Sequence, residues 1–191
     1  MMGAPKLCDD HTLQELVNAI QSGAKDEIEQ ADRLLVEYPE DGRLHFLRGS
    51  LLAGIGRSIE ALSALRKAVE LVPDMAIARF QLGFFLLTSG DAAEALSVWG
   101  PLALLPDGHY LRYFVGGLTH LIRDEFADAV SMLEEGIAAN QENPALNGDM
   151  GLIIEQVGKL RADARGATVE GEEMSATSML LGQFAPNRTR H

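Results

Sequence analysis

The chain has 191 residues, 47% of them hydrophobic, which suits one domain with its own core. Its 28 acidic and 16 basic residues give a formal charge of −12, which disfavours nucleic acid and anionic membranes as partners, because both require a basic face. No apolar run is long enough for a signal peptide or a membrane span. We therefore expect a soluble, cytoplasmic protein without membrane insertion.

The only cysteine, Cys8, lies close to the N-terminus. A single cysteine excludes an internal disulfide and a thiolate metal cage. We expect it to have no role, because it lies near a loose chain end.

The first two predicted helices cover about His11 to Gln21 and about Lys25 to Tyr38, where apolar residues recur at helical spacing. Ser22-Gly23 should end the first helix and Pro39 the second. This pair lacks the small residues that mark the later pairs, as is typical of a terminal repeat with a neighbour on one side only.

The following part of the chain has a period of 34 residues. Three helix pairs are predicted, over Gly42 to Pro73, Ala76 to Pro106 and His109 to Asn140, with breaks near residues 54–56, 89–91 and 123–125. Such a period, with a small residue on each helix, is typical of helix-turn-helix solenoids, because small side chains let paired helices approach closely. The recurring small residues are Gly49, Gly83, Gly117 and Gly151 on the first helices, and Ala61, Ala95 and Ala129 on the second.

Two features interrupt the period. Gly100-Pro101 follows Trp99 where an unbroken helix would continue, and Pro101 should kink or end that helix because it has no N–H to donate. After the last pair, Pro144 should open a lone helix that Gly158 ends. The composition then changes, which predicts a linker over Arg161 to Gly171 and a short amphipathic segment over 172–184.

These patterns resemble the tetratricopeptide repeat (TPR) family. In the pair over Ala76 to Pro106, Leu82, Gly83 and Leu86 match the family pattern on the first helix, and Ala95 and Trp99 match it on the second. Arg48, Arg79 and Gly116 depart from it. The resemblance implies an all-α, right-handed α-solenoid over residues 8–160, with pairs at about 8–41, 42–75, 76–109 and 110–143, a capping helix at 144–157, and a linker and C-terminal tail at 161–191.

In this family the first helix of each pair lines a concave groove, so the resemblance implies which side chains face it. Phe46, Phe80 and Phe114 hold the same position in successive repeats, which predicts an apolar groove for a protein or peptide with apolar anchors. The alternative is that these rings are core, since apolar residues at helical spacing usually are. The predicted groove residues are Phe46, Ile77, Phe80, Phe84, Leu87, Leu111, Phe114, Leu118 and Leu121, with Arg79 and Arg112 at the rim.

Two further expectations concern what the groove holds. The segment 172–184 has apolar anchors on a tether and could dock into the groove itself; its anchors are Met174, Leu180, Leu181 and Phe184. A carboxylate-clamp mode for chaperone tails is excluded, because that mode needs Lys and Asn at positions where this chain has residues such as Phe80 and Phe84.

No catalytic constellation is recognisable. The five histidines form no HxxxH or HxH pair, and no glycine-rich phosphate loop follows a strand, so we expect no catalytic residue, no metal and no cofactor. The favoured function is a non-catalytic adaptor, assembly factor or scaffold. The alternatives are a cytoplasmic chaperone for a secreted or membrane-bound hydrophobic client, as some small bacterial TPR proteins are, and a homodimeric or larger scaffold.

Overall fold

The computed structural model describes residues 5–23 and 25–166, and within these ranges the chain is all-α. The sequence predicts one repeat domain over 8–160. The structure groups the described residues into two compact units, one ending at Phe85 and one beginning at Leu86, so that the boundary falls inside helix α5 (Ala76–Thr88).

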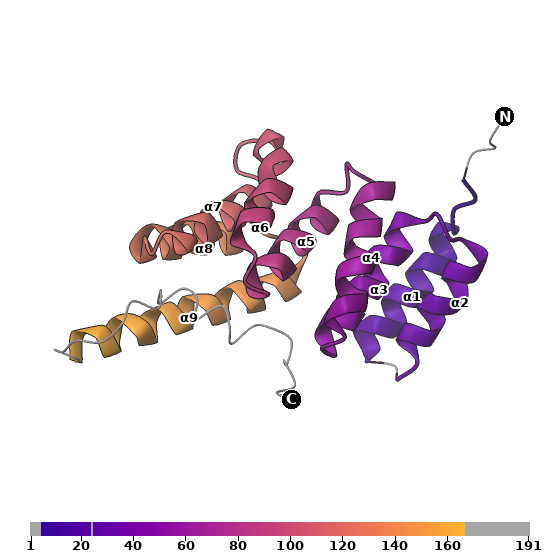
Figure 1. The fold of residues 1–191 in the computed structure, drawn as a ribbon, viewed down its shortest axis with the longest axis horizontal. Helices are drawn as coiled ribbons and strands as arrows, with labels where there is room; N and C mark the ends of the chain where they lie inside the picture. The colour runs from indigo at the N-terminus through magenta and orange to yellow at the C-terminus, as the bar shows by residue number, and fades with distance from the viewer. Residues whose placement is uncertain (1–4, 24, 167–191) are drawn as a thin grey trace. The chain divides into compact units, whose positions relative to one another are not determined.

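Unit 1 is a series of four helices before α5: α1 (Asp10–Ser22), α2 (Glu27–Glu37), α3 (Gly42–Gly54) and α4 (Ser58–Leu71). Each packs against the next along the chain, as Figure 1 shows in indigo to magenta. The predicted ends of the first pair are confirmed to within two residues. Gly23 ends α1 in a left-handed conformation, with φ of 68° and its N–H donated to the carbonyls of Ala19 and Ile20.

The segment before α1 belongs to the core of unit 1. Cys8 is buried in one apolar cluster with Leu16, Ala31 and Leu44. Its backbone N–H donates to the Asp41 carboxylate at 3.0 Å, which ties this segment to the start of α3. The expectation that Cys8 has no role is therefore corrected, because its side chain fills part of the core.

Asp41 holds several chain segments together with a carboxylate that is 1% exposed. It accepts the backbone N–H of Arg43 at 3.0 Å and the Arg43 Nη2 hydrogen bond at 2.7 Å, while Arg43 also reaches Asp10 at 2.9 Å. Burial alone would raise the pKa of Asp41, but the hydrogen bonds from Arg43 and the Cys8 N–H outweigh it and hold the pKa below its ordinary value.

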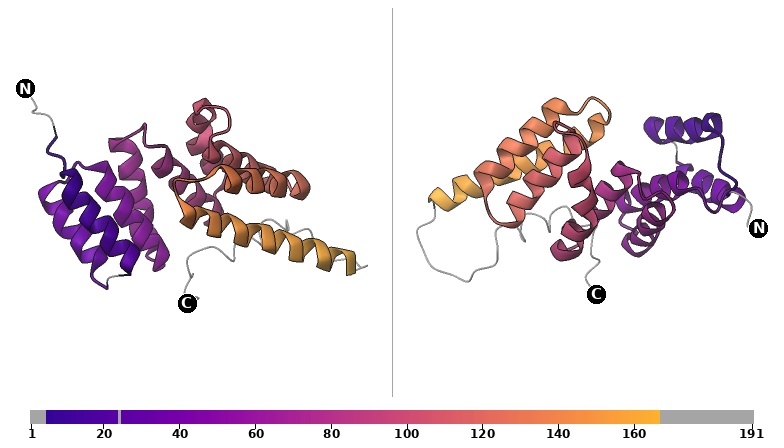
Figure 2. Two further views of the ribbon diagram at one scale, coloured as in Figure 1. Left: turned by 180° about the vertical axis from the view of Figure 1, so that it is seen from behind. Right: turned by 90° about the horizontal axis from the view of Figure 1, so that it is seen from above.

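Unit 2 contains α6 (Ala92–Trp99), the 3₁₀ helix η1 (Gly100–Leu104), α7 (Tyr110–Ile122), α8 (Phe126–Ala139) and α9 (Pro144–Gly166). Helix α7 packs on α8 and α8 on α9, which is clearest in the right-hand view of Figure 2. The early end of the helix at Gly100-Pro101 is confirmed: α6 stops at Trp99, and η1 takes the place of its last turns.

The 34-residue period of the sequence is present in the backbone. Helices α7 and α8 begin and end two periods after α3 and α4. A Cβ added to Gly49 would lie 2.8 Å from Leu65 Cγ, and one added to Gly117 would lie 2.7 Å from Leu133 Cγ. Gly49 and Gly117 therefore have the same role in their pairs, because the absence of a side chain lets the second helix of the pair approach closely.

The turns inside the helix pairs repeat as well. Gly56, Gly90 and Asp124 lie one period apart and have positive φ, of 77°, 93° and 59°. In each turn this residue donates its N–H to the carbonyl three positions before it. Asp124 is the only non-glycine residue with positive φ among the described residues.

The last helix is longer than the sequence predicts. Helix α9 continues through Gly158 to Gly166, so the predicted capping helix over 144–157 and the start of the linker at Arg161 are corrected. A glycine in a helix interior costs only about 1 kcal/mol relative to alanine. Here Glu155 and Lys159 form an ion pair of 2.7 Å across this turn, at a spacing that supports a helix.

Candidate interaction surfaces

The predicted groove residues of α7 lie in the core. Phe114, Leu118 and Leu121 are 0% exposed, and Leu111 is almost as deeply buried. A Cβ added to Gly136 of α8 would lie 2.5 Å from Phe114 Cδ1, so the Phe114 ring fills the space that this glycine leaves. These four residues are corrected from groove to core, because they have almost no surface open to a ligand and the Phe114 ring packs against the second helix of its own pair.

Tyr110, at the start of α7, completes this part of the core. Its ring meets Phe114 edge to face, with centroids 5.7 Å apart. Burial, assisted by the nearby Glu142 carboxylate, raises the pKa of Tyr110 to about 12. The tyrosine is therefore neutral across the physiological range.

The predicted groove residues of α5 are buried too. Phe80, Phe84 and Leu87 have little or no exposed surface, and the Phe80 and Phe84 rings stack with centroids 6.1 Å apart. Their assignment to an open groove is corrected in the same way. Ile77 and Phe46 are half-buried, so they are the only members of the predicted set with appreciable exposed surface.

The two predicted rim arginines hold backbone carbonyls near the starts of their helices. Arg79 donates to the Pro73 carbonyl at 3.0 Å, and Arg112 donates to the Leu105 carbonyl at 2.9 Å. The predicted docking segment, with Met174, Leu180, Leu181 and Phe184, lies outside the described residues.

Unit 1 carries an open groove that sequence reasoning missed. It has a volume of about 750 Å³ and lies over α2, α3 and α4; we call it the α2–α4 groove. Val36 and Ile59, which are among its lining residues, are 86% and 88% exposed. Both stand on second helices, whereas the family resemblance directs attention to the first. The lining residues are Asp32, Leu35, Val36, His45, Arg48, Ile59, Leu62, Ser63, Ala64, Arg66, Lys67 and Glu70.

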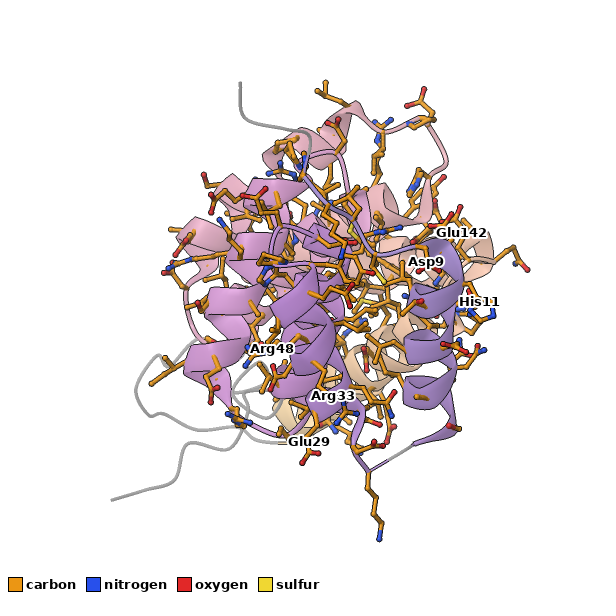
Figure 3. The ribbon with its side chains drawn as sticks, turned by 90° about the vertical axis from the view of Figure 1, so that its right-hand side faces the viewer. Asp9, His11, Glu29, Arg33, Arg48 and Glu142 are labelled. Carbon is orange, nitrogen blue, oxygen red and sulfur yellow. The ribbon has the colours of Figure 1, made fainter. Side chains whose placement is uncertain are left out.

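The charges of this groove are arranged as ion pairs at its edges. Arg48 of α3, labelled in Figure 3, donates a hydrogen bond to Asp32 of α2 and forms an ion pair with it. Lys67 and Glu70 pair at 3.0 Å on α4, with both side chains partly exposed. Exposed pairs of this kind are worth about 1 kcal/mol or less, so a charged ligand can exchange with them at little cost.

Unit 2 carries a smaller pocket, of about 240 Å³, between α6–η1 and α7. We call it the Trp99 pocket. It exists because α6 stops at Trp99 and η1 follows a different path, which leaves a space beside α7. Its lining residues are Leu96, Trp99, Gly100, Leu102, Ala103, Arg112, Val115, Gly116 and Thr119.

Other kinds of site were sought in the part of the chain that the structure describes. It holds no group of three or more His, Cys, Asp or Glu side chains placed to bind a metal ion. None of its helices combines the length and the apolar character that crossing a bilayer requires. Comparison with protein-family models and with curated proteins found no match for this chain.

Proposed function

We propose that the chain is a right-handed α-solenoid of TPR-like repeats that acts without catalysis, as an adaptor or assembly factor. Its binding site is the α2–α4 groove, and its ligand is an amphipathic helical segment of another protein with acidic residues beside its apolar face. The support comes from the repeated helix pairs, from the apolar walls of the groove and from its local charge.

The exposure of Val36 and Ile59 is the observation that carries the proposal. Single exposed apolar residues are common on protein surfaces and need no explanation. These two are almost fully exposed and line one groove that also includes the half-buried Leu35 and Leu62. Exposed apolar residues beside half-buried apolar residues suit an amphipathic helix that packs side chains against them at every third or fourth position.

The charge of the groove favours an acidic ligand. Its lining includes three basic residues, Arg48, Arg66 and Lys67, against the two acidic residues Asp32 and Glu70. The chain as a whole has a formal charge of −12, whereas the groove lining has one more basic than acidic residue. Such a local field speeds the association of an acidic segment and orients it.

The first test compares Ile59→Asp with Leu104→Asp. Both positions are 88% exposed, but Leu104 lies on η1 in unit 2. Proteins captured from the native lysate by the full-length wild type, and quantified by mass spectrometry, should include one that Ile59→Asp loses and Leu104→Asp retains. The proposal fails if the two variants capture the same proteins in the same amounts.

A second test uses two model peptides of about 18 residues, five helical turns, with the same apolar face. One has Glu on the flanks of that face and the other has Lys. The Glu peptide should bind at least about tenfold more tightly, and about 0.5 M salt should weaken it. Equal affinity for both peptides would contradict the acidic ligand.

A further inference from the structure

The Trp99 pocket has apolar walls and a cation among its lining residues. Leu96, Trp99 and Leu102 line it from α6 and η1, and Val115 lines it from α7. Its charged member is Arg112. Small-molecule sites commonly combine a mostly apolar surface with a few polar groups that fix the orientation of the ligand.

Only one of the three guanidinium nitrogens of Arg112 donates a hydrogen bond within the part of the chain that the structure describes. Its Nη1 atom donates to the Leu105 carbonyl and to the Asp107 carboxylate. Neither Nε nor Nη2 has an acceptor within hydrogen-bond distance among the described residues. Because a guanidinium has five N–H donors in a fixed plane, a second carboxylate can bind there in addition to, or in place of, Asp107.

Asp107 shows that the guanidinium accepts a carboxylate in this setting. Its side chain is 98% exposed, so water competes strongly with the ion pair and the bond is easily exchanged. An incoming carboxylate with an apolar body would gain contacts in the pocket that Asp107 does not make.

The volume limits the size of the ligand. At about 30 Å³ per water molecule in the liquid, a space of 240 Å³ corresponds to about eight waters, or about eight to ten non-hydrogen atoms of a ligand. This is smaller than a typical drug-sized site, so the pocket suits a small ligand.

We propose that the Trp99 pocket binds a small monocarboxylate with an apolar body, such as a short-chain fatty acid. The apolar part lies against Leu96 and Val115, close to the buried Trp99, and the carboxylate bonds Arg112. This site is in unit 2, uses none of the residues of the α2–α4 groove, and does not depend on the proposed function.

The chain contains its own probe, because Trp99 is its only tryptophan and lines the pocket. Hexanoate is titrated into the full-length protein while Trp99 fluorescence is followed, and hexanamide, of the same size and uncharged, is titrated in parallel. Hexanoate should give a saturable change and bind about tenfold more tightly than hexanamide, because it alone forms the charge-assisted bond.

Three variants locate the site. Arg112→Gln should remove the preference for hexanoate, and Ala103→Leu should abolish binding by filling the pocket from an exposed position. Asp107→Asn should tighten hexanoate binding about two- to threefold, because it removes the competing carboxylate. The matched controls are Arg123→Gln and Ala138→Leu, exposed residues of unit 2 that do not line the pocket and should leave binding unchanged.

Several results would overturn the proposal. Hexanoate and hexanamide of equal affinity would show that Arg112 does not recognise the ligand. Weaker binding by Asp107→Asn would show that Asp107 supports the ligand, contrary to the exchange described above. Unchanged binding by Ala103→Leu would place the ligand elsewhere. Circular dichroism of each variant identifies any that has lost its fold. If a variant is unfolded, the proposal is judged on the wild-type protein alone, by whether it binds hexanoate more tightly than hexanamide.

Discussion

The helix pairs α3–α4 of unit 1 and α7–α8 of unit 2 have the same architecture but differ in the cap and the turn. Their helix bounds correspond residue for residue across two periods, and in both a glycine of the first helix faces a leucine of the second. The cap before the first helix differs, with Asp41 in one pair and His109 in the other. The turn differs too, with Gly56 in one and Asp124 in the other.

This difference shows which parts of the repeat are fixed by packing. The glycine contact between helices leaves no room for a larger residue, so it recurs unchanged. The cap needs only a hydrogen-bond acceptor, and the turn needs only a residue that tolerates a positive φ. Several residue types meet each requirement. Unit 1 uses its cap for an additional purpose, since Asp41 also holds Cys8 and Arg43.

The largest expected effect comes from the caps. Asp41→Ala should destabilise unit 1 by about 3 kcal/mol, because it removes a buried acceptor and leaves the half-buried Arg43 without the carboxylate that accepts its Nε and Nη2 hydrogen bonds. His109→Ala should cost unit 2 about 0.5 to 1 kcal/mol, the loss of an ordinary cap whose Nδ1 accepts the Leu111 N–H at 3.2 Å. Hydrogen exchange resolved by residue measures both. Equal losses in the two units would contradict the additional role of Asp41.

The glycine contact gives the next largest effect. Gly117→Ala should destabilise unit 2 by about 2 kcal/mol, because the new Cβ would lie 3.0 Å from the Ala129 carbonyl oxygen and closer still to Leu133. Gly151→Ala is the matched control: it occupies the same repeat position on α9 but has no atom within 4 Å of the added Cβ. It should be neutral or stabilising by up to about 1 kcal/mol. Chemical denaturation followed by circular dichroism checks both variants.

The Asp41 cap should make the stability of unit 1 depend on pH. Because the pKa of Asp41 in the folded state lies below its ordinary value of 3.8, its contribution to stability is fully present above that value and is lost as the pH falls through the folded-state pKa. Denaturation midpoints measured from neutral pH down to about pH 3 should therefore fall less steeply for Asp41→Asn than for the wild type. Parallel curves would show that other carboxylates account for the acid sensitivity.

The smallest expected effect concerns the turn. Gly56→Asp gives unit 1 the residue type that unit 2 has at Asp124, and it should cost about 1 kcal/mol, since a left-handed conformation strains a residue with a Cβ. Gly54→Ala, an added methyl group with no neighbour within 4 Å, should cost nothing. A neutral Gly56→Asp would mean that the two turns are interchangeable.

The sequence predicted the elements better than it predicted the surfaces. The period, the turns and the stop at Trp99 follow from small residues and from proline, whose effects are local. The orientation of Phe114 could not be predicted, because helical spacing shows that a stripe is apolar without showing which neighbour covers it. Gly136 was the available signal, since a glycine opposite a recurring aromatic residue indicates a space for the ring.

The α2–α4 groove was missed for a related reason. The family resemblance directed attention to the first helix of each pair, whereas Val36 and Ile59 stand on second helices.

The end of the last helix was predicted too early. Gly158 indicates a stop because glycine commonly follows a helix, but an ion pair spans the turn that contains it. Side-chain contacts between turns are not apparent from composition alone.

The burial of Cys8 has a practical consequence. Burial raises the pKa of its thiol, so the thiolate that reacts with disulfide reagents is scarce while the N-terminal segment stays in place. Because Cys8 is the only cysteine of the chain, the rate at which such a reagent labels the protein reports how often this segment detaches from α1 and α3.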